Sequence, residues 1–232
     1  MDGNGRWATQ RNLPRFAGHK EGLKVAQKII KQSAKLGIQT LSLFAFSSEN
    51  WSRPKKEVDY LMSLFVESLK KEVFKLHENK LCLKFIGDRT NFSKDMIKLI
   101  SKAEDLTKNN QGMCLVIALN YGGKWDILHA TQTIAHKVEQ GLLKSSEINE
   151  ELFSQHLSIA DLAYPDLFIR TSGEQRLSNF FLWQLAYAEI YFCQDYWPNF
   201  NEKKYQEALD WYTSRERRYG LTSEQLVGEN DA

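Results

Sequence analysis

The sequence has few of the features that mark secreted, zinc-binding or membrane-spanning proteins. It holds three cysteines (Cys82, Cys114 and Cys193) without a C-x-x-C pair, and five histidines without H-x-x-x-H spacing. The cysteines lie in apolar, strand-like runs, so we expect buried free thiols in a reducing compartment. No apolar run approaches the ~18 residues of a membrane span, and no signal peptide precedes Asp2. We therefore expect a cytoplasmic protein without a transmembrane segment.

An excess of charge of one sign is also lacking. The 31 Lys and Arg residues nearly balance the 29 Asp and Glu residues, for a formal net charge of +2. This balance gives no reason to expect a nucleic-acid partner, so local arginines must attract any anion. A nucleotide-binding phosphotransferase would need a G-x-x-x-x-G-K-[ST] loop, and the sequence has none. The length of 232 residues and the apolar content of 42% suit one large globular domain.

Apolar residues follow a helical period in some segments and form short continuous runs in others. We predict helices at 23–36, 54–77, 92–109, 124–140, from about 149 and over 202–217, and strands at 41–46, 81–86, 113–119, 166–169 and 188–193. Such alternation predicts a central, mostly parallel sheet flanked by helices, with right-handed crossovers. We therefore predict a single α/β domain over residues 1–232, with a flexible polar tail at about 220–232.

Polar residues follow four of the predicted strands at their carboxyl ends. The segments are 47–50 (SSEN), 87–89 (GDR), 120–123 (NYGG) and 170–173 (RTSG). In open parallel sheets, ligands bind at this edge. The four segments are therefore expected to line one site.

Two stretches place glycine beside a carboxylate and an arginine, at 2–7 (DGNGRW) and at 170–179 (RTSGEQRLSN). Glycine lets backbone N–H groups approach phosphate oxygens, arginine binds those oxygens bidentately, and aspartate can hold Mg²⁺. With the third polar cluster at 47–53 (SSENWSR), they predict a metal-assisted diphosphate site. A tight turn is the alternative for the first stretch, and a solvated loop for the second.

Two further features allow more than one interpretation. Glu189 lies within the apolar run AYAEIYF, where an unpaired carboxylate would be costly, so it should meet a metal or an arginine unless it faces the surface. The 54–77 segment carries an apolar stripe that includes Met62 and Phe65. Ordinary core packing is the default for that stripe, and a channel for a hydrocarbon is the alternative.

In this order, the motifs resemble those of the cis-prenyltransferase family. They are DGNGRWA (2–8), R-x-x-G-H-x-x-G (15–22), FSSENWSRP (46–54), NYGG-x-WD (120–126), RTSGEQRLSNF (170–180) and WQ-x-AYAE-x-YF (183–192). The resemblance covers nearly the whole chain. The D-D-x-x-D motif of the all-helical trans-prenyltransferases is absent.

The resemblance implies a homodimeric enzyme that uses Mg²⁺ to condense isopentenyl diphosphate onto farnesyl diphosphate. Its product would be a long-chain polyprenyl diphosphate, a lipid-carrier precursor for cell-wall polysaccharide. A cytoplasmic protein peripheral at the inner membrane would deliver this product to the membrane. A non-catalytic partner subunit of the same fold is the alternative. Such a chain should have lost the acidic and arginine residues that this one retains.

The resemblance also assigns residues to roles. Asp2 and Glu189 would hold the metal, and Asn50 would take part in proton removal. Substrate-binding residues would be Gly3, Asn4, Gly5, Arg6, Trp7, Arg15 and His19 for the allylic diphosphate, Ser47, Ser48, Glu49, Trp51 and Arg53 between the substrates, and Arg170, Arg176, Leu177 and Ser178 for isopentenyl diphosphate.

The sequence departs from the family in two places. The strand that precedes the Asp2 loop in the family is missing, so Asp2 is expected to be poorly anchored unless other groups hold it. Gln175 stands where some members carry histidine. A growing hydrocarbon needs an apolar channel, which we expect between 113–119 and 54–77, opening at the Asp2 loop and walled by some of Leu43, Ala45, Met62, Phe65, Met113 and Ile117.

Overall fold

The computed structural model describes residues 1–218, 222 and 225, so most of the predicted tail at 220–232 lies outside the described residues. The helices are α1 (Asn4–Thr9), α2 (Arg15–Lys35), α3 (Lys55–Glu78), α4 (Lys94–Thr107), α5 (Gly123–Glu139), α6 (Glu150–Ser154) and α7 (Glu202–Thr213), with 3₁₀ turns η1 (Ser48–Ser52), η2 (Ser145–Glu147) and η3 (Trp197–Asn199). The strands are β1 (Thr40–Ser47), β2 (Cys82–Ile86), β3 (Cys114–Tyr121), β4 (Leu167–Arg170) and β5 (Glu189–Phe192).

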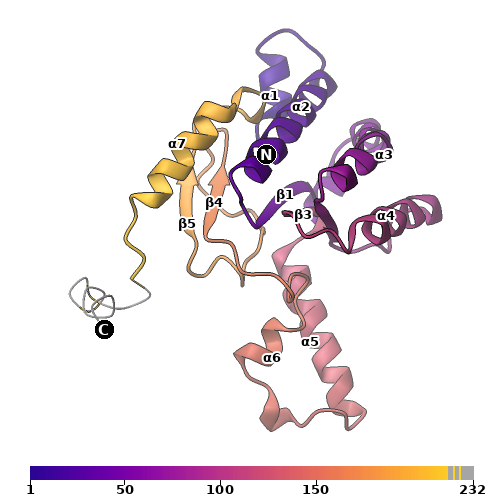
Figure 1. Ribbon diagram of the computed structural model, residues 1–232. Coiled ribbons are helices and arrows are strands. Elements are labelled where there is room, and N and C mark those ends of the chain that lie inside the picture. Colours follow the sequence, from indigo (N-terminus) through magenta and orange to yellow (C-terminus); the bar gives the residue numbers. More distant parts are fainter. Residues whose placement is uncertain (219–221, 223–224, 226–232) are drawn as a thin grey trace.

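The described strands pair in parallel, as the alternation of strands and helices predicts. Hydrogen bonds divide them between a three-stranded sheet of order β1-β3-β2 and a two-stranded sheet of β4 and β5. Helices α3 and α4 lie beside the first sheet, and α7 lies beside β4 and β5 (Figure 1). The carboxyl ends of β1 and β4 carry Ser47 and Arg170, the residues that begin two of the predicted site segments.

Packing on both faces of β3 explains its continuous apolar sequence. Leu115 and Leu119 pack with Leu43 of β1 and with the buried stripes of α2 and α3, while Val116 and Ala118 belong to a second cluster with Phe180. Burying a Leu or Val side chain stabilises a fold by about 1.5–3 kcal/mol. The sheet is therefore a rigid platform for the loops at its carboxyl edge.

The structure differs from the predicted elements at both ends of the chain. Residues Asn4–Thr9 form helix α1 where a loop was expected, because Gly3 caps the helix in a left-handed conformation (φ +94°) and its carbonyl accepts from the Trp7 N–H at 2.8 Å. Helix α7 ends at Thr213 rather than near 217, and Arg217 instead pairs with Asp166.

The predicted free thiols are confirmed. Cys114 and Cys193 are buried, whereas Cys82 is half-buried. Burial raises the pKa of Cys114 to about 12, so this thiol stays protonated at neutral pH. Among the described residues, no helix combines the length and the apolar character needed to cross a membrane.

Candidate active site

Asp2 is firmly anchored, contrary to the expectation from the missing strand. Its backbone N–H donates to the Thr171 hydroxyl at 2.9 Å, and its carbonyl accepts from the Trp197 N–H at 2.8 Å. Its carboxylate Oδ2 accepts a hydrogen bond from Arg170 Nε at 2.9 Å and lies 2.8 Å from a terminal nitrogen of the same guanidinium. Residues beyond the β4 carboxyl end and Arg170 therefore hold Asp2 in place.

Arg170 joins the two glycine-containing stretches that the sequence analysis singled out. Its side chain is only 8% exposed, whereas the Asp2 side chain is 41% exposed. Besides Asp2, the guanidinium binds the Ser178 hydroxyl at 2.8 Å and the Arg176 carbonyl. A buried arginine needs such partners, so Arg170 organises the site as well as carrying its charge.

Glu174 links two other predicted site arginines. Its carboxylate lies 2.9 Å from the Arg6 guanidinium and 2.5 Å from that of Arg176. The hydrogen bond from Arg176 is the main cause that lowers the pKa of Glu174, and the charge of Arg6 adds to it. Arg6 also donates to the Ser172 hydroxyl at 2.7 Å.

A second glutamate, Glu57, gathers the remaining predicted cations. Its carboxylate lies 3.3 Å from Arg15 Nε, 3.2 Å from the Arg53 guanidinium and 3.5 Å from His19 Nε2. Burial lowers the pKa of His19 below 6.5, Glu57 opposes this shift, and Arg53 and Arg15 add to it. His19 is therefore neutral at pH 7.

The segment after β1 forms the 3₁₀ turn η1 through local hydrogen bonds. The Asn50 side-chain oxygen accepts from the Ser47 N–H at 3.2 Å and completes a capping box. The Trp51 indole donates to the Asn120 side chain at 2.7 Å, and Asn120 donates to the Asp88 carbonyl at 2.7 Å. Three predicted strand-end segments therefore meet at this edge, as expected.

The NYGG-x-WD and WQ motifs meet at one buried carboxylate. Asp126 is 1% exposed and accepts from the Tyr121 hydroxyl at 2.8 Å and from Gln184 at 3.0 Å. The backbone N–H and the hydroxyl of Ser158 also donate to it, at 3.0 and 2.7 Å. This satisfied carboxylate fixes the positions of β3 and the 180–185 segment behind the site.

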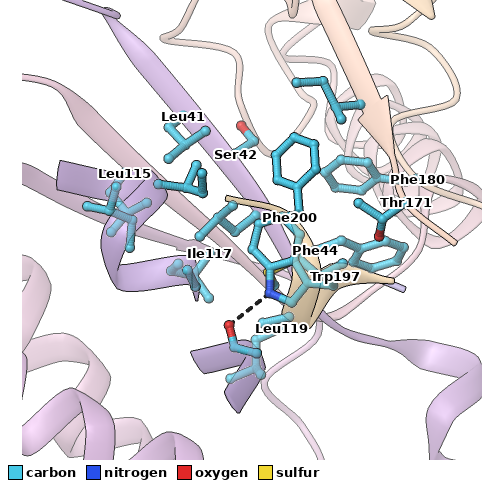
Figure 2. A pocket seen from close by; sticks show the side chains of 18 of the residues that line it. Leu41, Ser42, Phe44, Leu115, Ile117, Leu119, Thr171, Phe180, Trp197 and Phe200 are labelled. Atoms are coloured by element: carbon cyan, nitrogen blue, oxygen red, sulfur yellow. Dashed lines mark hydrogen bonds between the residues drawn. The ribbon is translucent and has the colours of Figure 1, made fainter. Parts of the chain in front are cut away.

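One cavity of about 2160 Å³ begins at these polar groups and extends between α2, α3, β1 and β3. Figure 2 shows Leu41 of β1 with Leu115, Ile117 and Leu119 of β3 around it. The predicted site residues that line it are Asp2, Gly3, Asn4, Gly5, Arg6, Arg15, His19, Ser47, Glu49, Asn50, Arg53, Arg170, Leu177 and Ser178. It therefore has a polar end and an apolar interior.

Five of the six residues expected to wall a hydrocarbon channel line this cavity. They are Leu43, Ala45, Met62, Phe65 and Ile117. Met113 does not line it. It precedes β3 and is 6% exposed, and the chain there leads into Cys114 in the second apolar cluster. The cavity is consistent with the predicted tunnel.

Trp7, Ser48, Trp51 and Arg176 do not line the cavity. The Trp7 indole donates to Asn199 at 2.8 Å, which directs it to another surface. Ser48 and Trp51 belong to η1, and Arg176 is engaged by Glu174. These four residues therefore lie outside the cavity wall, with Arg176 next to the lining residue Leu177.

Glu189 is not brought to Asp2 within one chain. It begins β5 opposite Leu167, whereas Asp2 contacts Arg170 at the other end of β4. Three residues of strand separate these ends by about 10 Å. The Glu189 carboxylate instead lies 3.5 Å from Arg215 Nε, so the arginine partner that the sequence allowed is the one found.

Two observations mark the polar end as a ligand site. Asn4 Oδ1 and His19 Nε2 are buried and make no hydrogen bond among the described residues, although Glu57 lies 3.5 Å from His19 Nε2. In the segment beyond β4, four non-glycine residues adopt positive φ angles: Ser172 (74°), Ser178 (49°), Asn179 (64°) and Phe181 (44°). Strained backbone of this kind clusters at functional sites.

Sequence reasoning gave no individual role to several residues that hold the site together. They are Glu57, Asn120, Thr171, Glu174 and Asn179. The Asn179 side chain, for example, donates to Glu49 at 2.6 Å. Asn120 lies within the NYGG segment, and the last three lie within the RTSGEQRLSN stretch, both of which were predicted to belong to the site. Glu57 lies four residues after Arg53 at the start of α3, where an acidic residue is also ordinary for a helix N-terminus.

The fold and the site together define a prenyltransferase of the cis type, with a diphosphate-binding edge above an apolar cavity. The chain belongs to the family described as "Putative undecaprenyl diphosphate synthase", whose model matches residues 1–220.

Known relatives agree with this membership. Ditrans,polycis-undecaprenyl-diphosphate synthase ((2E,6E)-farnesyl-diphosphate specific) of Vibrio cholerae is 55% identical over 97% of this chain and 90% of that protein. The protein of the same name from Coxiella burnetii is 54% identical, over 97% of this chain and 95% of that one.

Two solved structures are similar in fold. Lavandulyl diphosphate synthase from Lavandula x intermedia, in complex with dimethylallyl diphosphate, has a TM-score of 0.91 and 39% identity, covering 95% of each chain. A probable undecaprenyl diphosphate synthase from Campylobacter jejuni has a TM-score of 0.76 and 35% identity, covering 87% of this chain and 92% of that chain.

Proposed function

We propose that this protein condenses isopentenyl diphosphate sequentially onto farnesyl diphosphate in cis, giving a long-chain polyprenyl (undecaprenyl) diphosphate. The observation that carries the proposal is the single cavity that joins Asp2 and the arginines to an apolar interior. A non-catalytic partner subunit is disfavoured, because such a chain has no need of an exposed Asp2 beside ordered arginines.

The allylic diphosphate would bind beside the Gly3–Gly5 segment. Arg15 lies against Gly5, where even a Cβ atom would come within 2.7 Å of the guanidinium carbon. Arginine and backbone N–H groups would stabilise the negative charge that develops as the C–O bond to the diphosphate breaks. Asn4 and His19 line the same cavity and would lie beside this substrate.

Asp2 fits a Mg²⁺ ligand of the kind that shares the ion with substrate phosphates. Both contacts from Arg170 go to the same carboxylate oxygen, Oδ2. In the described part of the chain, no three His, Cys, Asp or Glu side chains form a metal site by themselves. Mg²⁺ is typically held by one or two carboxylates plus phosphate oxygens, and it would neutralise charge on the leaving group.

Isopentenyl diphosphate would bind at Arg170, Arg176 and Ser178. Its alkene would form the new C–C bond to the allylic carbon, after which a proton is lost. Asn50 is the proposed participant in proton removal, because its side chain lines the cavity between the two diphosphate positions. The apolar interior would exclude water from the carbocation and receive the growing chain.

We further propose that the protein acts as a cytoplasmic homodimer, peripheral at the inner membrane, and delivers its product to that membrane. A long polyprenyl chain cannot remain in water, since each exposed CH₂ costs about 0.8 kcal/mol. Glu189, which does not reach Asp2 within one chain, lies on β5, where a second copy could approach it.

Incubation with radiolabelled isopentenyl diphosphate, farnesyl diphosphate and Mg²⁺, followed by chain-length analysis, tests this function. The proposal predicts a long-chain labelled product that disappears with a metal chelator. Absence of any labelled product with the full set of substrates would refute it.

A further inference from the structure

Glu57 lies within ion-pair distance of two arginines and a histidine, and the proposed function gives it no role. It lies in the first turn of α3 and its side chain is 15% exposed. Arg15 and His19 approach it from α2, and Arg53 approaches it from the end of η1. One carboxylate therefore ties the first turns of α2 and α3 to the segment that carries Asn50.

The orientation of Arg15 shows which edge of its guanidinium group Glu57 binds and which edge remains free. Its Nε donates to Glu57 Oε2 at 3.3 Å, while its two terminal nitrogens lie toward Gly5. An ideal Cβ at Gly5 would meet those nitrogens at 2.8 and 2.9 Å. Glu57 thus occupies one edge of the guanidinium and leaves the other edge facing Gly5 at the start of α1. Arginine can bind two anions in this way because its five N–H groups are fixed in one plane.

We propose that Glu57 is a positioning residue for the allylic substrate, which holds Arg15, Arg53 and His19 so that their free edges meet the incoming diphosphate. The inference rests on the proposed function. It assigns Glu57 no contact with the reacting atoms. Without its charge, Arg15 and Arg53 repel each other, and His19 loses a carboxylate at 3.5 Å that favours its protonation.

The ordinary alternative is that Glu57 only favours the start of α3, as acidic residues do at helix N-termini. A nearby acidic residue provides a matched control. Asp59 lies in the same helix and pairs with Lys55 at 2.6 Å, but its side chain is 59% exposed and contacts none of the three cations. Glu57→Gln and Asp59→Asn therefore remove the same charge from the same helix.

Binding of an unreactive thio analogue of farnesyl diphosphate, measured by calorimetry, is the test. Glu57→Gln should weaken binding roughly tenfold, as expected for an arginine freed from its position, whereas Asp59→Asn should leave it within twofold. Glu57→Asp, which keeps the charge but withdraws it by one methylene, should weaken binding in the same direction. The Glu57→Asp variant can take the place of Glu57→Gln in this test if Glu57→Gln does not fold.

Nuclear magnetic resonance of the histidine side chains supplies a readout that a purely structural role would not move. The groups that face His19 are Glu57 from α3, Arg53 from η1 and Arg15 from α2. Glu57→Gln should lower the pKa of His19, and Asp59→Asn should not. Unchanged binding and an unchanged His19 pKa in Glu57→Gln would overturn the inference. Wild-type protein that binds the analogue but makes no product would overturn the proposed function alone.

Discussion

The two ends of the cavity are built in different ways. At the polar end, Asp2 and Arg170 are held by hydrogen bonds of defined geometry, from segments that are about 170 residues apart in the chain. In the interior, Leu41, Ile117 and Phe65 are held by apolar packing from three different elements. Hydrogen-bonded positions tolerate little change, whereas packed walls can change size. We therefore expect substitutions at the first end to alter rates and affinities, and those in the interior to alter the product.

The largest expected effect is at Asp2. Asp2→Ala should lower turnover by about 10²–10³, the scale of losing one charge-stabilising group in a transition state. Steady-state kinetics at saturating Mg²⁺ measure it, and Asp2→Asn separates the loss of charge from the loss of the hydrogen bond to Arg170. Near-normal turnover by Asp2→Ala would mean that the polar end does not act through this carboxylate.

Substitutions of Arg170 and Arg176 should differ in their effect on the stability of the fold, although both should weaken the binding of isopentenyl diphosphate. Both Arg170→Ala and Arg176→Ala should raise KM for isopentenyl diphosphate roughly 10- to 100-fold. Only Arg170→Ala should also lower the free energy of unfolding, by about 2–3 kcal/mol, because it removes charged hydrogen bonds from a side chain that is 8% exposed. Arg176 is 61% exposed and should show no such loss in urea denaturation.

If both arginine variants weakened only the allylic substrate, the division of the polar end into two diphosphate pockets would be wrong. Equal loss of stability in the two variants would contradict the description of Arg170 as the buried centre of the site.

The interior should respond in product length. Leu41 lies near the start of β1, away from the polar end, and lines the cavity (Figure 2). Leu41→Trp should shorten the main product by one or more isoprene units while the first condensation remains fast. Leu128→Trp is the control, because Leu128 is 56% exposed on α5 and does not line the cavity. A full-length product from Leu41→Trp would place the hydrocarbon elsewhere.

The smallest effect concerns pH and stability. Burial alone would raise the pKa of Glu57, but the hydrogen bond and charge of Arg15 and the charge of Arg53 hold it below 4.5. A lowered pKa in the folded state stabilises the protein above about pH 4.5, and this stabilisation is lost as the pH falls through the folded-state value. The contribution should be below about 1 kcal/mol, because the arginines are partly exposed.

Urea denaturation at pH 7 and pH 3 measures this pH effect. The difference in stability between the two pH values should be smaller for Glu57→Gln than for the wild-type protein. An identical difference in the two proteins would show that Glu57 gains nothing from its cations.

Local sequence patterns revealed the elements and the polar site, but they did not reveal the contacts between distant segments. Helices and strands followed from periodicity, and the polar site followed from glycine, arginine and carboxylate in the 2–7 and 170–179 stretches. The anchoring of Asp2 by Thr171 and Trp197 could not be predicted, because no local pattern states which distant groups will meet. Glu57 was missed for a related reason: its spacing from Arg53 is common on helix surfaces, and its contact with α2 is tertiary.

Other details of the site could not be predicted for a similar reason. Met113 belongs to the apolar run expected to wall the channel, but one strand carries side chains on both faces and sequence alone does not say which face meets the cavity. The apolar run around Glu189 predicted a metal or an arginine as its partner, and the arginine is Arg215. Sequence alone did not give the register, in which Glu189 begins β5 and pairs with the start of β4.

The most direct test of the account is a crystal structure with Mg²⁺ and the thio analogue of farnesyl diphosphate. The account predicts the diphosphate beside Gly3–Gly5, within hydrogen-bonding distance of Arg15, with the metal on Asp2 and the farnesyl chain between β1, β3 and α3. A diphosphate bound away from Asp2, or a farnesyl chain lying outside the cavity, would contradict the central claim that one cavity joins the charged end to the hydrocarbon wall.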